Sequence, residues 1–311
     1  MSFAILFPGQ GSQSVGMLAA LADEFEVVKQ TFAEASDALS YDLWSIVKDG
    51  PVEKLNETTI TQPAMLAADI ACWRVLQQHQ SKTATHFAGH SLGEYTALVA
   101  SNSLQFGDAI KLVAERGRLM QQAVPAGIGA MAAILGLDDE TVIKVCSDSA
   151  AAEVVSAVNF NSPGQVVIAG NKAAVERTIE AAKAVGAKRA LLLPVSVPSH
   201  CALMKPAADE LAAYLNTVEF KSPDIPVIHN VDVQQHTDLA KIKNALTSQL
   251  HQPVRWVDSI KTIANSGTTN LIECGPGKVL TGLVKRIDKS LSCVAFYDKA
   301  GLDKAIALIN D

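Results

Sequence analysis

One serine in this 311-residue chain stands in a sequence pattern that could support covalent chemistry. Residues 89–93 read Gly-His-Ser-Leu-Gly, a Gly-x-Ser-x-Gly pentapeptide. Residues 85–88 can close a short strand before it, and residues 94–100 have the composition of a buried helix after it. A serine on such a sharp strand-to-helix turn has its hydroxyl lifted out of the sheet, beside free backbone N–H groups. The pattern therefore predicts that Ser91 is a nucleophile, with an ordinary Gly/Ser turn as the alternative.

A serine hydroxyl is a poor nucleophile at neutral pH and needs a base, for which seven histidines are available. His200 is favoured because it follows Ser91 in the chain, as the base does in α/β hydrolases. It also lies on a proline-containing segment at the junction of two predicted domains, where clefts form. His90 adjoins Ser91, but its place on the turn predicts a side chain that points elsewhere. A hydrogen-bonded structural histidine is the alternative for His200.

A tetrahedral intermediate needs about two N–H donors aimed at its oxygen. The N–H of Leu92, directly after the serine, is one natural donor. The loop of residues 8–13, Pro-Gly-Gln-Gly-Ser-Gln, could supply the second, because its glycines let backbone approach a ligand. The rival interpretation of this loop is a dinucleotide fingerprint, but Ser14 stands where the third glycine belongs.

Two other kinds of site find little support in the sequence. Residues 275–278, Gly-Pro-Gly-Lys, lack the spacer and the following Ser or Thr of a phosphate-binding P-loop. His86 and His90 are four residues apart but lie on a strand end and a turn, and the chain has no His-Glu-x-x-His motif. We therefore expect no metal.

Arg116 is placed by helical spacing on the inward face of the predicted helix 107–124. Its neighbours three and four residues away are Leu112, Val113, Leu119 and Met120, whereas Arg118 faces mostly polar residues. A buried guanidinium without an anion is costly. The partner is either an internal Asp or Glu or a carboxylate on the substrate, and the spacing leaves both open.

Further candidates have simpler interpretations. Cys201 adjoins His200 but reads as a core cysteine. Asn159 and Asn161, near a domain edge, are typical turn or cap residues, with substrate contact as the alternative. Three basic residues within about one helical turn form either a solvated face or a docking patch: Lys285, Arg286 and Lys289.

Alternating strand-like and helix-like stretches predict an α/β fold with a mainly parallel sheet. Residues 126–197 follow the order βαββαβ of a ferredoxin-like unit, inserted into a large domain formed by 1–125 and 198–311. The strands of the insert are expected at 130–135, 154–159, 165–169 and 189–195, with helices after 138 and at 172–185. Large-domain strands are expected at 3–7, 85–88, 227–230 and 270–273. Helices are expected after residue 13 and at 63–78, 94–100, 107–124, 206–215, 239–250, 256–265 and 282–289.

The composition fits a compact globular protein. It is 49% hydrophobic and 19% charged, with a mean hydropathy of +0.19, which excludes disorder. The net charge of −6 argues against nucleic acid as a general partner. We find no apolar run long enough for a membrane span and no signal peptide. Five scattered cysteines favour reduced thiols and a cytoplasmic location.

Taken together, these motifs resemble the malonyl-CoA:acyl carrier protein transacylases of type II fatty acid synthesis over the full length of the chain. The matching residues are Phe7 to Gln13, Gln62 to Ala64, Gly89 to Tyr95, Arg116-Gly117, Asn159 to Gln165, Pro198 to His200, Gln249 with Pro253 to Trp256, and Gly275 to Gly277. The resemblance implies a hydrolase-like α/β domain that carries a ferredoxin-like subdomain.

The resemblance also implies roles at the site. Ser91 would be the acylated nucleophile and His200 its base, oriented by the backbone carbonyl of Gln249. The N–H groups of Gln10 and Leu92 would form the oxyanion hole. Arg116 would bind the free carboxylate of malonyl. Further substrate-binding candidates are His90, Asn159 and Ser199.

The implied activity is transfer of malonyl from malonyl-CoA to the phosphopantetheine thiol of acyl carrier protein. We expect no cofactor, since the CoA thioester is a substrate, and a monomeric protein. The alternatives are a serine thioesterase or esterase on the same fold and a non-catalytic nucleotide-binding module.

Overall fold

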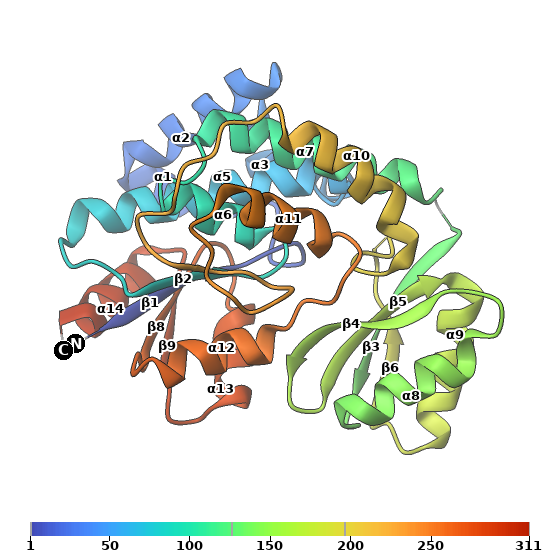
Figure 1. Cartoon of the computed structure of the whole chain (residues 1–311). Helices are drawn as coiled ribbons and strands as arrows, with labels where there is room; N and C mark the ends of the chain where they lie inside the picture. Colours follow the sequence, from blue (N-terminus) through green and yellow to red (C-terminus); the bar gives the residue numbers. More distant parts are fainter. Residues whose placement is uncertain (1, 126, 196, 311) are drawn as a thin grey trace.

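Two separate sheets organise the chain (Figure 1). The computed structural model describes residues 2–125, 127–195 and 197–310; residues 1, 126, 196 and 311, which include predicted domain ends, lie outside it. One sheet has five strands in the order β7-β2-β1-β8-β9, and every pairing in it is parallel. The other has four antiparallel strands. The predicted mixed α/β fold with a parallel sheet is confirmed.

Strand β1 (Phe3–Phe7) shows why the parallel sheet lies between two layers of helices. All five of its residues are buried, so both of its faces are covered. Phe3, Ile5 and Phe7 pack into one core with α2, α5, α7 and α14. Ala4 and Leu6 point to the opposite face, into a second core with α12 and α13 (Figure 1).

The remaining elements around this sheet have the following bounds. The strands are β2 (His86–Gly89), β7 (Val227–Ile228), β8 (Asn270–Cys274) and β9 (Ser292–Phe296). The helices before the small sheet are α1 (Ala19–Glu24), α2 (Glu26–Leu39), α3 (Leu43–Asp49), α4 (Val52–Leu55), α5 (Thr58–His79), α6 (Gly93–Ala100) and α7 (Phe106–Ala123). Those after it are the short η1 (Ala202–Met204), α10 (Lys205–Leu215), α11 (Leu239–Gln249), α12 (Trp256–Asn265), α13 (Val279–Ile287) and α14 (Lys299–Asn310).

The small sheet follows the predicted order βαββαβ and has its own apolar core. Its elements are β3 (Gly129–Leu135), α8 (Asp139–Ala150), β4 (Val155–Ser162), β5 (Gln165–Asn171), α9 (Lys172–Ala184) and β6 (Arg189–Leu192), with strand order β4-β5-β3-β6. Two backbone hydrogen bonds tie β4 to the segment before α12: Val254 N–H donates to Val158 O (2.8 Å) and Phe160 N–H donates to Val254 O (3.0 Å). These bonds hold the small sheet next to the carboxyl ends of the parallel strands.

Several predicted bounds differ from the structure. Helix α5 was predicted to begin at Pro63, but it begins at Thr58 and contains Pro63. A proline usually lies in the first turn of a helix, which had indicated the later start. Strand β7 ends at Ile228, because His229 and Asn230 turn away toward buried partners. Strand β6 ends at Leu192, and α13 ends at Ile287. The partly exposed edge strand β9 and the helix α14 were not predicted.

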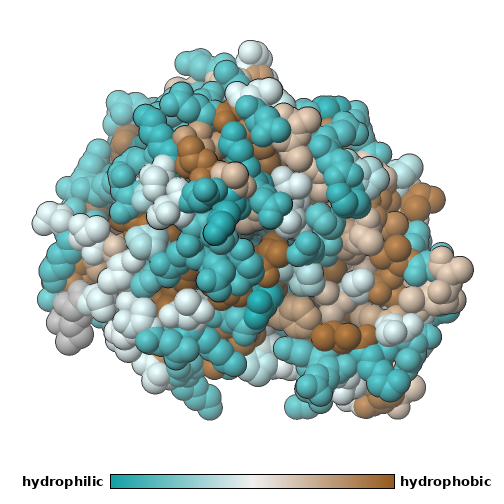
Figure 2. Space-filling view, viewed as in Figure 1, coloured by the Kyte–Doolittle hydropathy of each residue, from teal (hydrophilic) through white to brown (hydrophobic). Residues whose placement is uncertain are grey.

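The exterior is largely hydrophilic on the face that Figure 2 shows, with hydrophobic residues gathered where α10 approaches the small sheet. None of the described helices combines the length and apolar composition that crossing a membrane requires.

Parallel register brings two loops together at one edge of the large sheet. Phe7, the last residue of β1, pairs with Gly89, the last residue of β2. His90 N–H then donates to Phe7 O (3.0 Å). The loop of residues 8–13 and the turn at Ser91 therefore leave the sheet side by side.

Candidate active site

The turn at Ser91 is built on positions where only glycine fits. A Cβ on Gly89 would lie 1.9 Å from the backbone of Gly93, and one on Gly93 would lie 2.1 Å from Phe7 O. Ser91 itself has a positive φ of 52°. A non-glycine residue in this region stores about 1–3 kcal/mol of strain and persists only where its surroundings hold it. The hydroxyl is thereby presented above the sheet, at the start of α6.

Asn230 holds this strained turn from the opposite side. Its Oδ1 accepts a hydrogen bond from Ser91 N–H (2.7 Å), and its Nδ2 donates to Gly89 O (2.8 Å). From the sequence, Asn230 was expected only to end a strand. Little in the sequence indicated its role here, because an asparagine at the end of a short strand is common.

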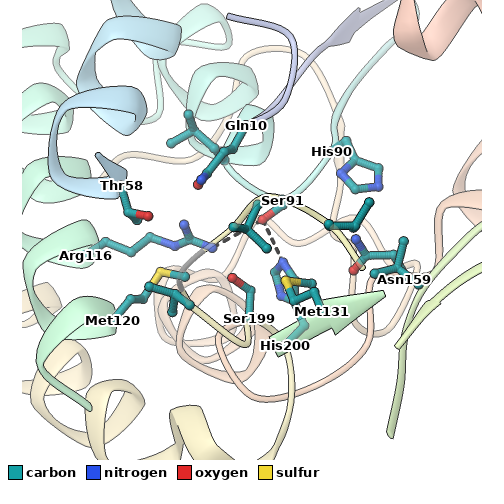
Figure 3. A pocket seen from close by; sticks show the side chains of 15 residues that line it. Gln10, Thr58, His90, Ser91, Arg116, Met120, Met131, Asn159, Ser199 and His200 are labelled. Atoms are coloured by element: carbon teal, nitrogen blue, oxygen red, sulfur yellow. Dashed lines mark hydrogen bonds between the residues drawn. The ribbon is translucent and has the colours of Figure 1, made fainter. Parts of the chain in front are cut away.

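Ser91 and His200, from segments 109 residues apart, meet at hydrogen-bond distance (Figure 3). Ser91 Oγ lies 2.8 Å from His200 Nε2. His200 Nδ1 lies 2.6 Å from the backbone O of Gln249, and a carbonyl can only accept, so Nδ1 carries the proton. In the neutral ring Nε2 is then free to accept the serine proton. His200 also has a positive φ of 66° and donates its N–H to Leu250 O (2.9 Å).

Burial lowers the pKa of His200 from 6.5 to about 3, and the nearby Arg116 guanidinium adds to this effect. The Gln249 carbonyl acts in the opposite direction, because it stabilises the charged ring. The imidazole is therefore neutral, in its proton-accepting form, across the physiological pH range.

The loop before α1 approaches the serine turn closely enough to supply a second N–H donor. A Cβ on Gly9 would lie 2.4 Å from His90 O, so only glycine permits this approach. Within the described residues, the N–H groups of Gln10 and Leu92 donate to no protein acceptor. Gln10 also lines the cavity at Ser91 (Figure 3). Two uncommitted donors next to a nucleophile are what an oxyanion hole requires.

Arg116 is buried, as its helical spacing predicted, with a side chain that ends at Ser91 (Figure 3). One NH group donates to Gln62 Oε1 (2.8 Å), and the other to Gln249 Oε1 (2.9 Å) and Ser91 Oγ (3.3 Å). Within the part of the chain that the structure describes, its Nε has no hydrogen-bond partner. Among the described residues Arg116 forms no ion pair, so the internal Asp or Glu partner left open by the sequence is not found. Arg118, by contrast, pairs with Glu115 on the exposed face.

A cavity of about 110 Å³ is lined by both Ser91 and Arg116. Its apolar wall includes Met120 on α7 and Met131 on β3, so both sheets contribute to it (Figure 3). The volume suits an acyl group of a few carbons rather than a long chain.

The three further candidates for substrate binding all line this cavity: His90, Asn159 and Ser199. His90 Nε2 lies 2.8 Å from Asn161 Oδ1, so its ring turns away from His200, as expected. Burial lowers the pKa of His90. Asn159 Oδ1 is buried and has no hydrogen-bond partner among the described residues, which leaves it open to a ligand. Asn161 is satisfied by His90, and the Cys201 thiol donates to Pro198 O (3.1 Å).

Glu94 is a second residue at the site, after Asn230, for which the sequence predicted no role. Its side chain is fully buried at the first turn of α6 and accepts hydrogen bonds from Asn230 N–H (3.0 Å) and Gln249 Nε2 (2.8 Å). The available signal was an acidic residue at the start of an otherwise apolar helix, where an acid also suits the helix dipole.

With this geometry established, we compared the chain with known proteins. The family model for the acyl transferase domain matches residues 4–304. The chain belongs to the acyl transferase domain family. The malonyl CoA-acyl carrier protein transacylase of Salmonella typhimurium is 58% identical over 304 residues, covering 98% of both chains. The protein of that name from Escherichia coli K12 is 56% identical over 306 residues, covering 98% of this acyl transferase and 99% of the relative.

Solved structures agree with this assignment. An acyl carrier protein S-malonyltransferase from Vibrio cholerae superposes with a TM-score of 0.95 at 63% identity, covering 98% of this acyl transferase and 99% of that chain. A malonyl-transacylase solved in complex with a type II polyketide synthase acyl carrier protein has a TM-score of 0.98 at 56% identity, with both chains fully covered.

Proposed function

We propose that this acyl transferase moves the malonyl group from malonyl-CoA to the phosphopantetheine thiol of acyl carrier protein in fatty acid synthesis. One observation carries the choice of acyl group. The hydroxyl that meets His200 is also 3.3 Å from the buried Arg116, whose hydrogen bonds go to neutral acceptors only. A nucleophile beside a cation without a carboxylate partner suits an acyl group that brings its own carboxylate.

In the first half-reaction, His200 Nε2 takes the proton of Ser91 as Oγ attacks the thioester carbon. The carbonyl oxygen becomes an oxyanion, which the N–H groups of Gln10 and Leu92 stabilise. Collapse breaks the C–S bond, and the proton on His200 goes to the departing CoA thiolate. The products are malonyl-Ser91 and CoA thiol.

In the second half-reaction, the carrier thiol gives its proton to His200 and attacks the same carbon. The seryl ester breaks, Ser91 regains its proton, and a malonyl thioester leaves. Water must be excluded while the ester exists, and the apolar walls at Met120 and Met131 favour that exclusion. The backbone carbonyl of Gln249 keeps the His200 ring in the required tautomer.

The proposal also covers the domain organisation, the substrate-binding residues, the cofactor requirement and the location of the enzyme. Residues 126–197 form a ferredoxin-like subdomain inserted in a hydrolase-like domain made of 1–125 and 198–311. The substrate-binding set includes His90, Asn159 and Ser199. The reaction as written needs neither cofactor nor metal, because the CoA thioester is already activated. We place the enzyme in the cytoplasm as a monomer.

Acyl carrier proteins are acidic, and we propose that a basic surface at the junction of the two sheets receives one. Lys285 and Arg286 are exposed at the end of α13, Lys289 follows, and Arg286 hydrogen-bonds Gln165 at the start of β5. The patch thus bridges the two sheets.

Intact mass measurement tests the proposal directly. Incubation with malonyl-CoA should add one malonyl group, and acyl carrier protein should then remove it as malonyl-carrier. Ser91→Ala should lose the adduct and on the order of 10⁶ in rate. A malonyl adduct retained by Ser91→Ala would refute the assignment of the nucleophile. Free malonate released at the same rate without carrier protein would instead identify a thioesterase.

A further inference from the structure

Glu94 is a buried carboxylate that the mechanism above does not use. Its side chain has no exposed surface, and its oxygens accept hydrogen bonds from His229 Nδ1 (2.7 Å), Asn230 N–H (3.0 Å) and Gln249 Nε2 (2.8 Å). Backbone and amide N–H groups can only donate, which suits an ionised carboxylate. Both carboxylate oxygens therefore accept hydrogen bonds, while His229 Nε2 is buried with no hydrogen-bond partner among the described residues.

Gln249 connects this carboxylate to the guanidinium. Its side-chain Nε2 donates to Glu94 Oε2 and to Ser91 O (2.9 Å), while its Oε1 accepts from Arg116 (2.9 Å). The amide therefore lies head to tail between the anion and the cation, and each charge polarises it in the same direction.

We propose that Glu94 is the indirect counter-ion of Arg116. Acting through the Gln249 amide, it stabilises the buried cation while the site is empty. Because it does not contact the guanidinium, it leaves Arg116 free to bind the carboxylate of an acyl group. The inference rests on the proposed function for the identity of that acyl group.

The physical reason is the cost of an uncompensated charge. A buried cation with no anion destabilises the fold, whereas a direct ion pair would satisfy Arg116 and weaken its need for a ligand. Burial lowers the pKa of Arg116, and Tyr95 and Glu94 counteract this. Asp232 and His236, which pair with each other (2.7 Å), lie beyond His229 and are the next titratable groups on that side.

Glu94→Gln is the informative change, because it removes the charge with little change in shape. The amide oxygen can still accept from Asn230 and Gln249, while its NH₂ donates to the other tautomer of His229. The empty protein should lose thermal stability. Malonate should restore it and bind on the order of tenfold more tightly than to the wild type, because it becomes the missing anion. Malonamide, which is uncharged, should give no such rescue.

Steady-state kinetics supplies a second readout. KM for malonyl-CoA should fall in Glu94→Gln, and transfer from malonyl-enzyme to the carrier should slow, because the acyl carboxylate is held more tightly. Acetyl-CoA should show neither effect. Glu94→Asp, which keeps the charge, should keep the wild-type response to malonate.

Two further variants control for structural damage. Asp69→Asn also replaces a fully buried carboxyl, one bonded to Thr96 on the same helix α6 and unconnected to Arg116, and should leave the malonate response unchanged. Glu94→Gln combined with Arg116→Met removes both charges and should be more stable than Glu94→Gln alone.

These experiments test the counter-ion role of Glu94 independently of the proposed malonyl transfer. Equal malonate responses in the wild type and Glu94→Gln, or additive stability losses in the double variant, would overturn the counter-ion role. Neither result would affect the malonyl adduct on the wild type, which tests the function. If Glu94→Gln folds only with malonate present, or only together with Arg116→Met, the role is supported.

Discussion

The oxygen of Ser91 receives contacts with opposite consequences. Arg116 donates to it and stabilises developing negative charge, whereas His200 must take its proton. The same guanidinium helps to lower the pKa of His200 to about 3, which makes the imidazole a weak base in the empty site. A carboxylate bound to Arg116 would offset that charge, so we expect the base to strengthen when a carboxylated acyl group enters.

This pKa leads to a prediction about the acidic limb of the pH profile. Because kcat/KM reports groups of the free enzyme, acylation by acetyl-CoA should stay constant as pH falls through 6.5 and decline only toward about 3. Arg116→Met should move the decline upward, because one of the causes of the low pKa is removed. NMR titration of the His200 ring measures the same pKa without turnover.

The lowered pKa of His200 also makes the stability of the fold depend on pH. Between pH 6.5 and about 3 the unfolded chain protonates this histidine and the folded protein does not. Its contribution to stability is therefore complete above 6.5 and is lost as pH falls through this window. If kcat/KM of the wild type instead declined at pH 6.5, and the NMR titration of His200 gave the same pKa, the ring would be far better solvated than its burial indicates.

At the level of elements, the site depends on how closely β1, β2 and α6 approach one another. Gly89 and Gly93 let the first turn of α6 contact the ends of both strands, and Gly9 lets the loop after β1 reach the turn. Close backbone packing, rather than side-chain burial, places the N–H groups of Gln10 and Leu92 near Ser91.

Replacement of Gly93 tests this arrangement. The added methyl of Gly93→Ala would lie 2.1 Å from Phe7 O, so backbone must shift. We expect a loss of about 3 kcal/mol in the free energy of unfolding, together with loss of acylation. Denaturant titration and adduct formation measure the two effects.

Gly107→Ala is the matched control, because Gly107 lies in helix α7 and its added Cβ would meet nothing within 4 Å. It should be neutral or stabilising by about 0.5–1 kcal/mol. Wild-type stability of Gly93→Ala would show that the turn is looser than its geometry indicates.

At the level of the whole molecule, both sheets contribute to one cavity, and the proposed function requires that acyl carrier protein reach it. The large sheet supplies Ser91 and the small sheet supplies Met131 and Asn159. The basic patch of Lys285, Arg286 and Lys289 lies where the end of α13 meets the first residue of β5.

Charge reversal tests whether this patch is the docking surface. Lys285→Glu combined with Lys289→Glu should reduce kcat/KM for acyl carrier protein by on the order of tenfold, most strongly at low salt. Transfer to a free pantetheine thiol should be unchanged, because that acceptor has no acidic surface. Lys111→Glu, an exposed change on α7, should leave both rates unchanged. Equal losses with both acceptors would place the defect in the cavity.

Local pattern in the sequence was sufficient for the strand-turn-helix at Ser91, the inward face of Arg116 and the βαββαβ order of the small sheet. Each depends on residues a few positions apart, where backbone geometry and periodicity are decisive. The bounds of α5 and β7 were less accurate, because contacts with distant residues set them.

The order of amino acids was enough to show which chemical groups the protein carries and which of them face inward. The folded arrangement alone shows that Arg116 has no carboxylate partner among the described residues, that Asn230 holds the serine turn, and that Glu94 reaches Arg116 through Gln249. These groups come from α6, α7, α11 and the segment after β7, and no local pattern fixes the distance between side chains on separate elements. Chain connectivity leaves those distances free until packing of the core sets them.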